Sequence, residues 1–488
     1  MEIAIIIGII GFGIILVTLY GKLKKPLPSA KVKIDGQSFP EGFLWSTGED
    51  AYQHEGGNYN NDWARWENQV PSPIANGDRC EQAVNFYQLY ESDFVRAKND
   101  FQNAHRIGIE WSRIEPEEGV YDLDVLDHYE KMLKSMKAKG FKVFLNLWHF
   151  TLPLWAVDKG GWTNESLMDS WCKYIKLCTE RFAKYVDYWS TMIDAQIYAL
   201  SGYALGDIPP NVKDQKQAFE IYRILIYAHA RAYKIIKEFG TVFVEGKKHK
   251  PRVGMIYFFF LYQPQGFFLD RIVTKQLDEL FNWKMLDAFY SGKVDIGILG
   301  GPKIKEENEQ LKGTIDWIGI NYYTREIISF NPFKPGFIAR HTCKASQTTD
   351  TGWEIYPEGI YTLCKVLQTK YPGIPLMVTE SGLADAYDEK RPQFILDHLA
   401  WLHRFIQEGG NLIGFTYWSL TDNWEWAEGF WPKFGLYSVD LETFERRERP
   451  SARLFRSIVR NNSLPTRETV EQILNNSSQD QALRNNRQ

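Results

Sequence analysis

Eight short, nearly continuous apolar runs alternate with longer amphipathic stretches along most of the 488-residue chain. Continuous apolar runs are typical of parallel strands buried on both faces, and apolar residues at helical spacing between them indicate connecting helices. Strand alternating with helix eight times predicts a single closed (β/α)8 TIM barrel of the α/β class, without internal repeats or linkers. The predicted strands lie near Phe43–Thr47, Ala104–Ile109, Lys142–Leu147, Tyr188–Ile193, Arg252–Phe259, Trp317–Tyr322, Leu376–Thr379 and Leu412–Tyr417.

Four of the intervening stretches carry apolar residues at helical spacing and predict long helices. Two inserts are instead polar or carry glycine and proline, and we interpret them as loops. The predicted helices are Val125–Lys139, Leu167–Val186, Lys216–Phe239 and Arg391–Glu408, and the predicted loops are Asn58–Ala83 and Phe330–Thr351.

Composition and motifs exclude several classes of function. With 57 Lys and Arg against 61 Asp and Glu, the net charge is −4, so the chain lacks the basic surplus typical of nucleic-acid binding. No Gly-rich phosphate loop follows a strand and no HExxH motif is present. The five cysteines form no CxxC pair, which favours reduced core thiols over a zinc site or a disulfide framework. We therefore expect no metal, no cofactor and no nucleic-acid partner.

The first 25 residues differ in character from the rest of the chain. Ile3–Tyr20 is a run of 18 residues without a charge. As a helix it would rise roughly 27 Å, which is enough to cross the apolar core of a bilayer. Glu2 precedes the run and three lysines follow it, so an uncleaved anchor is favoured, with a cleaved signal peptide as the alternative. The positive-inside rule then favours a single-pass membrane protein whose barrel faces the cytosol.

The predicted organisation has four parts. Residues 1–25 form one N-terminal transmembrane helix and membrane anchor, and residues 26–37 form a linker. Residues 38–460 form the barrel, and residues 461–488 form a polar, disordered tail. The tail is rich in Asn, Gln and Arg and offers few apolar residues to a core.

Polar and aromatic side chains follow the ends of the predicted strands. In a (β/α)8 barrel these ends meet at one face, where the working residues lie. Aromatic rings pack on the C–H face of a pyranose, and Gln, His and carboxylates bind its hydroxyl groups, so this mixture predicts a carbohydrate site. The strand-end residues are Glu49, Gln53, Glu55, Trp111, Arg113, Trp148, His149, Asp194, Gln196, Tyr322, Tyr323, Glu380, Trp418, Asp422, Asn423, Glu425 and Trp426.

Asp194 and Glu380 end the fourth and seventh predicted strands and form a candidate catalytic pair. Cleavage of a glycosidic bond uses two carboxyl groups: one attacks or stabilises the anomeric carbon, and the other protonates the departing oxygen. An acid at a strand end taken alone is more often a capping residue. Glu380 is the stronger candidate because it follows a buried run and precedes Gly382, where the barrel opens.

Around these carboxylates the sequence resembles glycoside hydrolase family 1, the β-glucosidases and β-galactosidases. The resemblance extends over Ser38–Val459 and consists of separate motifs in the same order along the chain. The segment Thr379–Gly382 is similar to the T-E-N-G nucleophile motif of the family. Further similar segments are Ala51–Gly56, Glu110–Ile114 with Pro116, Asn321–Tyr323, Trp418–Trp426, Phe434–Leu436 and Val439–Asp440.

The resemblance implies a role for each matching residue. Glu380 would be the nucleophile, held by Tyr323 and Arg106, and Asp194 would be the acid/base. An Arg and a Tyr beside a carboxylate favour its ionised form, which a nucleophile needs. The residues that would bind the sugar are Gln53, His149, Trp353, Trp418, Glu425 and Trp426.

The segment Thr191–Ala195 departs from the T-x-N-E-P acid/base motif of the family. Asp194 stands in place of Glu, and its shorter side chain withdraws the carboxyl oxygens by roughly 1 Å, which weakens proton delivery. Ile193 stands in place of the Asn that binds the sugar 2-hydroxyl, a contact that strengthens in the transition state. Glu49 and Asp50 are expected to add negative charge beside the site and so to raise the pKa of Asp194.

Three functions are consistent with this pattern. The first is a retaining β-glycosidase, an O-glycosyl hydrolase with altered or reduced activity on β-glucosides or β-galactosides. The second is a transglycosylase on membrane glycolipids, which an anchor would bring to the active site. The third is a catalytically impaired protein that binds carbohydrate through the retained residues. We favour the first function, with a carbohydrate or glycolipid as substrate.

Overall fold

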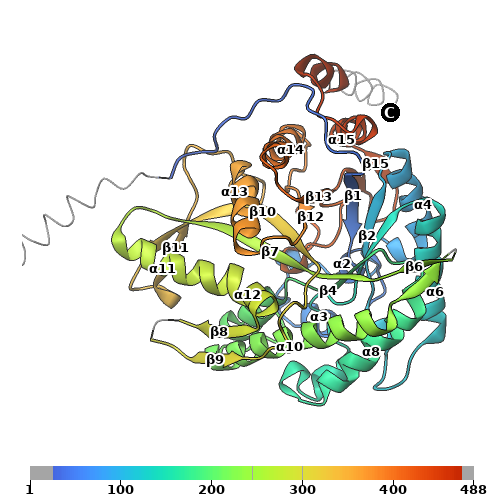
Figure 1. The fold of residues 1–488 in the computed structure, drawn as a ribbon, viewed down its shortest axis with the longest axis vertical. Coiled ribbons are helices and arrows are strands. Elements are labelled where there is room, and N and C mark those ends of the chain that lie inside the picture. The colour runs from blue at the N-terminus through green and yellow to red at the C-terminus, as the bar shows by residue number, and fades with distance from the viewer. Residues whose placement is uncertain (1–25, 245, 299, 475–488) are drawn as a thin grey trace, which may run out of the picture.

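The eight predicted strands form a closed parallel sheet. The computed structural model describes residues 26–244, 246–298 and 300–474. Within these residues the strands pair in the order β1, β2, β3, β4, β7, β10, β12 and β13, and β13 pairs with β1 to close the barrel. The predicted α/β barrel is therefore confirmed (Figure 1). The strands are β1 (Leu44–Glu49), β2 (Ala104–Gly108), β3 (Lys142–Asn146), β4 (Tyr188–Ile193), β7 (Arg252–Pro264), β10 (Trp317–Phe330), β12 (Leu376–Ser381) and β13 (Leu412–Tyr417).

Alternate strand residues fill the inside of the barrel. Phe144 and Tyr188 stack there with ring centroids 4.3 Å apart, and the edge of Trp317 packs against both rings. Ile193 and Ile256 belong to the same buried cluster. Because successive side chains of a strand point to opposite faces, the other residues of each strand pack against the surrounding helices. The interior is thus a solid apolar core, and the polar residues lie above it at the strand ends.

Helices cover the outside of the sheet, and the four predicted long helices correspond to α6, α8, α10 and α14. The helix α6 begins at its cap Asp122, whose side chain accepts a hydrogen bond from the Val125 backbone, and its apolar stripe is buried. The helices are α2 (Ala51–His54), α3 (Asp62–Glu67), α4 (Phe86–Asn99), α5 (Trp111–Ile114), α6 (Leu123–Ala138), α7 (Leu154–Asp158), α8 (Leu167–Phe182), α9 (Ala195–Ala199), α10 (Gln215–Phe239), α11 (Phe268–Asp278), α12 (Lys284–Ser291), α13 (Glu358–Lys370), α14 (Arg391–Gln407) and α15 (Pro450–Asn461).

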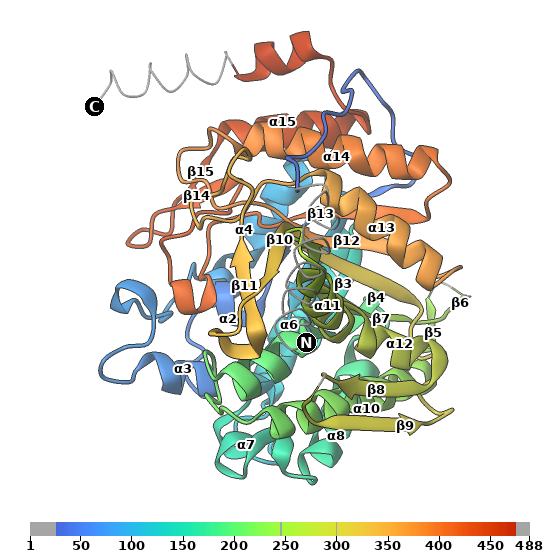
Figure 2. The same cartoon turned by 90° about the vertical axis from the view of Figure 1, so that its left-hand side faces the viewer.

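The strands β7 and β10 continue past the barrel and pair along their extensions, through Arg325–Ile328 of β10. Both inserts predicted as loops contain regular structure, which corrects that prediction. The segment Asn58–Ala83 contains α3, and Phe330–Thr351 contains β11 (Ile338–His341), which pairs antiparallel with β10. Contacts with distant parts of the chain stabilise these short elements, and a local apolar pattern does not reveal such contacts. Figure 2 shows β11 and α11 on the side of the molecule that faces the viewer. Short pairs elsewhere are β5 (Val242–Val244) with β6 (Lys247–His249), β8 (Lys293–Gly297) with β9 (Lys303–Glu307), and β14 (Tyr437–Val439) with β15 (Arg446–Glu448).

The structure describes part of the predicted C-terminal tail but none of the predicted N-terminal anchor. The predicted anchor, residues 1–25, lies outside the described residues, and in the part that is described no helix is long and apolar enough to cross a bilayer. The predicted tail starts as ordered chain: Leu464 is buried, and residues 467–474 are helical with Val470 and Ile473 packed on the core. These three apolar side chains explain the difference from the prediction. Residues 475–488 lie outside the described part.

Candidate active site

Glu380, near the C-terminal end of β12, receives two strong hydrogen bonds. Arg106 Nη2, from the middle of β2, lies 2.8 Å from Glu380 Oε1, and the Tyr323 hydroxyl on β10 donates to Glu380 Oε2 at 2.7 Å. Burial raises the pKa of Glu380, whereas the Arg106 charge and the Tyr323 hydrogen bond act against this rise. Both partners stabilise the ionised carboxylate, and each donates to a different carboxylate oxygen.

Asp194 follows β4 directly and adopts a left-handed backbone conformation, with φ of 52°. Asn321 on β10 donates to both carboxyl oxygens of Asp194, at 3.3 and 3.4 Å. The Thr379 hydroxyl donates to the Asn321 side-chain oxygen at 2.9 Å and so fixes the orientation of this amide. Burial, and then the nearby charge of Glu380, raise the pKa of Asp194 well above its usual range. This rise favours the protonated form of Asp194.

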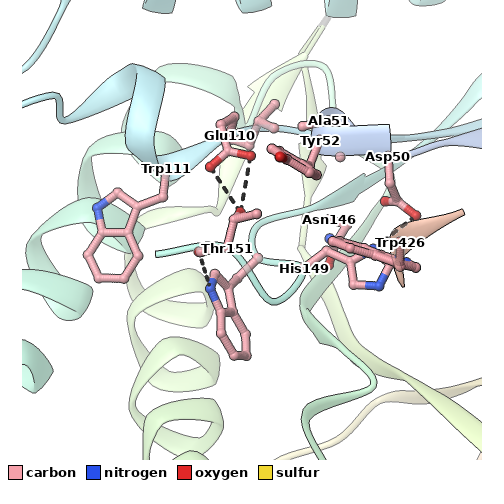
Figure 3. A pocket seen from close by; sticks show the side chains of 12 residues that line it. Asp50, Ala51, Tyr52, Glu110, Trp111, Asn146, His149, Thr151 and Trp426 are labelled. Carbon is pink, nitrogen blue, oxygen red and sulfur yellow. Dashed lines mark hydrogen bonds and ion pairs between the residues drawn. The ribbon is translucent and has the colours of Figure 1, made fainter. Parts of the chain in front are cut away.

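A third carboxyl group, Asp50, lies between Arg106 and His149. Asp50 Oδ2 is 3.0 Å from Arg106 Nη1 and 3.2 Å from His149 Nδ1. Burial opposes ionisation of Asp50, but the charges of Arg106 and His149 outweigh it and hold its pKa at about 2. Figure 3 shows Asp50 pointing toward His149, with Trp426 beside them in the same pocket.

Glu49, the neighbour of Asp50, points away from this site. Its carboxylate lies 2.6 Å from His105 Nε2, and the His105 ring packs against Phe94 and Phe141 in the layer outside the barrel. The expectation that Glu49 adds charge beside the catalytic pair is therefore wrong, because adjacent strand residues face opposite ways. Asp50 alone acts there, and its charge raises the pKa of both Asp194 and Glu380.

The six residues predicted to bind sugar surround this group. Gln53 donates to the Trp424 carbonyl at 2.8 Å, and its buried side-chain oxygen has no partner. Trp418 donates from Nε1 to Glu425 at 3.1 Å, and burial raises the pKa of Glu425 to about 8. The Trp353 ring contacts that of Tyr323, with centroids 5.6 Å apart. His149 and Trp426 pack edge to face with their ring centroids 4.8 Å apart. All six therefore lie at the mouth around the pair of carboxyl groups.

Sequence comparisons assign this chain to a family. The family model described as Glycosyl hydrolase family 1 matches residues 35–464. The chain belongs to glycosyl hydrolase family 1. Similar relatives include a β-galactosidase of Pyrococcus woesei, 32% identical over 89% of this chain and 99% of the relative, and β-glucosidase A of Thermotoga maritima, 30% identical over 88% and 99%.

Solved structures agree with this family assignment. A β-glycosidase from Pyrococcus horikoshii superposes with a TM-score of 0.79 at 34% identity, covering 91% of this chain and 98% of that structure. The β-glucosidase from Thermotoga maritima in complex with glucoimidazole superposes with a TM-score of 0.78 at 28% identity, covering 88% of this chain and 100% of that structure. The resemblance drawn from the sequence motifs is thus confirmed at the level of the family.

Several strand-end residues of this family 1 chain serve structure instead of the site. Glu55 pairs with Arg113 at 3.0 Å and accepts a hydrogen bond from Tyr129, and Asp422 pairs with Arg449 at 2.8 Å. Sequence reasoning assigned no role to Asn321, and for Asp50 it predicted only a negative charge beside the site. Asn321 lies within a motif that was noticed, so its polar side chain in a buried strand was a usable signal. No local pattern indicated that Asp50 would contact Arg106.

The described residues hold no cluster of three or more His, Cys, Asp or Glu side chains arranged to bind a metal. All five cysteines are unpaired thiols. The mouth contains several carboxyl groups, and their surroundings shift their pKa values by different amounts. Arg106 contacts both Asp50 and Glu380 and lowers the pKa of each, although burial still leaves the pKa of Glu380 raised; no arginine of the described residues forms an ion pair with Asp194 or Glu425, and burial raises the pKa of both. Such a separation of pKa values between neighbouring acids is what acid/base chemistry requires.

Proposed function

We propose that the chain is a retaining β-glycosidase that hydrolyses β-glucosides or β-galactosides. The observation that carries the proposal is the buried pair formed by Glu380, which Arg106 and Tyr323 contact, and Asp194, whose pKa burial and the charge of Glu380 raise well above its usual range. Two carboxyl groups in opposite protonation states are the requirement for double displacement at an anomeric carbon. The names of the relatives, β-glucosidase and β-galactosidase, support this choice of substrate.

The reaction would follow two steps. In the first, a Glu380 oxygen attacks the anomeric carbon while Asp194 transfers its proton to the glycosidic oxygen, which leaves as an alcohol. A glycosyl ester on Glu380 results, and Asp194 is left ionised. In the second, Asp194 removes a proton from water, the water oxygen attacks the anomeric carbon, and Glu380 leaves as a carboxylate. The configuration at the anomeric carbon is retained because it is inverted twice.

We further propose that this activity is lower than a longer acid at position 194 would give. The Asp194 side chain is short, and the preceding Ile193 is fully buried in the apolar cluster inside the barrel. Ile193 therefore offers no hydrogen bond to a sugar hydroxyl. A misplacement of the acid by about 1 Å can lower the rate about 100-fold, most strongly for leaving groups that need the proton.

The test of Asp194 uses substrates with different leaving groups. Asp194→Ala should lower kcat/KM on alkyl β-glucosides by roughly 100-fold or more, whereas a dinitrophenyl glucoside, whose leaving group needs no proton, should keep most of the first-step rate. Added azide should restore turnover and give a β-glycosyl azide, because the small anion needs no base. Asn321→Ala, which leaves the carboxyl in place, is the matched control and should show a smaller loss. Equal losses of the Asp194→Ala variant on both substrates, without azide products, would contradict the assignment.

A transglycosylase is the second candidate, and an apolar wall favours it. Phe258, Phe434 and Trp353 pack around Tyr323 beside the catalytic pair. An apolar wall binds an apolar aglycone and also binds an acceptor that competes with water. Product analysis distinguishes the two activities, because hydrolysis releases free sugar and transglycosylation releases a new glycoside. Free sugar as the main product at any acceptor concentration would exclude the second candidate.

A further inference from the structure

Five large apolar side chains are exposed together beyond the ends of β7 and β10. We call this group the aromatic tip. Phe333 is 93% exposed, and Phe337 is 56% exposed. Phe267, Phe268 and Ile272, at the start of α11, are between 40% and 47% exposed. Isolated exposed apolar residues are ordinary. A group of five on adjacent elements indicates a surface that contacts another molecule when the protein functions.

Hydrogen bonds at Asp270 bring the two halves of the aromatic tip together. The buried Asp270 carboxylate accepts from the Phe330 backbone at the end of β10, at 2.8 Å, and from the Phe267 backbone before α11, at 2.7 Å. Phe337 stacks on Phe330, with ring centroids 5.9 Å apart. The β10–β11 connection and the start of α11 therefore form one rigid projection, and the exposed rings are presented by ordered backbone.

The N-terminal segment meets the fold at the base of the same projection. The Leu27 carbonyl accepts a hydrogen bond from Arg325 Nη2 at 2.6 Å, and the Pro26 carbonyl lies 3.8 Å from the Cys343 thiol. Arg325 belongs to the extension of β10, and Cys343 follows β11 by two residues. Figure 1 shows the first described residues beginning on the side of the molecule where β11 and α11 lie. The uncharged run of residues 3–20 thus precedes, by six residues, a point beside the aromatic tip.

This projection also lies on the side of the catalytic mouth. Arg325 comes two residues after Tyr323, whose hydroxyl binds Glu380, and β7 and β10 extend in the direction of their C-terminal ends. Arg271, on the exposed side of α11, and Lys334, beside Phe333, add positive charge around the rings, whereas Lys275 lies 3.8 Å from Glu279, which balances its charge. Aromatic side chains flanked by basic residues are typical of surfaces that lie in the headgroup region of a bilayer with anionic lipids.

We propose that the aromatic tip docks on a lipid bilayer beside the inserted N-terminal run and holds the barrel mouth at the lipid headgroups. The consequence for substrate, which rests on the proposed glycosidase function, is that the enzyme takes β-glycosides of membrane lipids. The apolar run of 18 residues, just long enough to cross a bilayer, argues for lipid as the occupant. Arg271 and Lys334 match the charge of an anionic surface.

Photocrosslinking tests the contact without relying on activity. The full chain, with p-benzoyl-phenylalanine in place of Phe333, is reconstituted in vesicles of phosphatidylcholine and phosphatidylserine and irradiated. Phe243, 72% exposed on β5 at the opposite end of β7, carries the same replacement as control. We expect a lipid adduct by mass spectrometry at position 333 and none at position 243. Absence of a lipid adduct at 333, or a crosslink to a second copy of the chain instead, overturns the proposal.

Turnover tests the consequence for substrate. In the same vesicles, the double variant Phe333→Ser/Phe337→Ser should cleave a β-glucosyl lipid about fivefold or more slowly than the parent chain, since the mouth is no longer held at the surface. Hydrolysis of a soluble aryl β-glucoside should be unchanged in this variant, and Phe243→Ser should change neither rate. Unchanged cleavage of the lipid substrate would overturn the docking role. If the parent chain cleaved neither substrate, the proposed function would be refuted, while the crosslinking result would still stand.

Discussion

At the scale of single residues, the site depends on how one arginine is shared. Arg106 contacts Glu380 with one nitrogen and Asp50 with the other, so its positive charge serves two carboxylates at once. Asp50 raises the pKa of Glu380, whereas Arg106 lowers it. Glu380, the proposed nucleophile, is therefore held less firmly in its ionised form than an unshared arginine would hold it. The sharing of Arg106 therefore affects the pH below which the first step is lost.

Replacing Asp50 should move the acidic side of the pH profile. Glu380 must be ionised to attack, so activity falls as the pH drops through the pKa of Glu380. Asp50→Asn removes the negative charge that raises this pKa, and the fall should therefore move to lower pH. The measurement is the pH dependence of kcat/KM on a dinitrophenyl glucoside, which needs no acid. Glu49→Gln, which alters the neighbour that faces His105, is the control and should leave the profile unchanged. A move of the acidic limb to higher pH in Asp50→Asn would contradict the argument.

At the scale of elements, the extension of β10 ties several segments to one buried ion pair. Arg325 and Glu354 are almost completely buried and lie 2.7 Å apart. Glu354 also accepts from the Ser346 hydroxyl and the Cys343 backbone, and Arg325 binds the Leu27 carbonyl. Trp353, predicted to bind sugar, is the neighbour of Glu354 in the chain. The ion pair therefore fixes the segment that presents Trp353 to the mouth.

Breaking this pair should be costly. Arg325→Met leaves the buried Glu354 carboxylate without its cation, and we expect a loss of about 3 kcal/mol in the free energy of unfolding. Arg340→Met is the matched control on the same β-hairpin, because Arg340 pairs with Glu326 at 2.7 Å but is half exposed. Because Arg340 is half exposed to solvent, this pair should contribute about 1 kcal/mol or less. Urea unfolding followed by circular dichroism measures both, and equal losses would refute the distinction.

The sequence predicted the elements whose burial is complete and missed those that depend on distant partners. All eight barrel strands were predictable because a strand buried on both faces reads as a continuous apolar run. The strand β11 has only four residues, none of them buried, and it pairs with the extension of β10, so no local pattern indicated it. From the sequence, both Glu49 and Asp50 were expected at the site. Their opposite orientations depend on where β1 ends, and the sequence does not show that point.

At the scale of the whole molecule, one continuous core joins the barrel and its helices, and it encloses most of the cysteines. Cys80, Cys178 and Cys364 are buried, and burial raises the pKa of the Cys178 and Cys364 thiols beyond the range of reactive thiolates. Cys172 and Cys343 are partly exposed. The fold therefore divides five thiols into two classes.

Thiol titration should separate these classes. A thiol reagent at pH 8 should modify at most Cys172 and Cys343 in the native chain within minutes, because only these two are accessible. After denaturation it should modify all five. Peptide mapping by mass spectrometry identifies the modified positions. Rapid native modification of Cys178 or Cys364 would contradict the packing of α8 and α13 against the barrel.

The assignment of Glu380 as nucleophile is tested most directly by trapping its glycosyl ester. A 2-deoxy-2-fluoro β-glucoside with a dinitrophenyl leaving group slows both steps, but its good leaving group restores the first without help from Asp194. The ester therefore accumulates even if the acid is weak. Mass spectrometry of the full chain should show one added fluoroglucosyl group, located by peptide mapping at Glu380 and lost in Glu380→Gln. An unlabelled chain that still binds the sugar by calorimetry, or a label at Asp50 or Glu425, would contradict the mechanism.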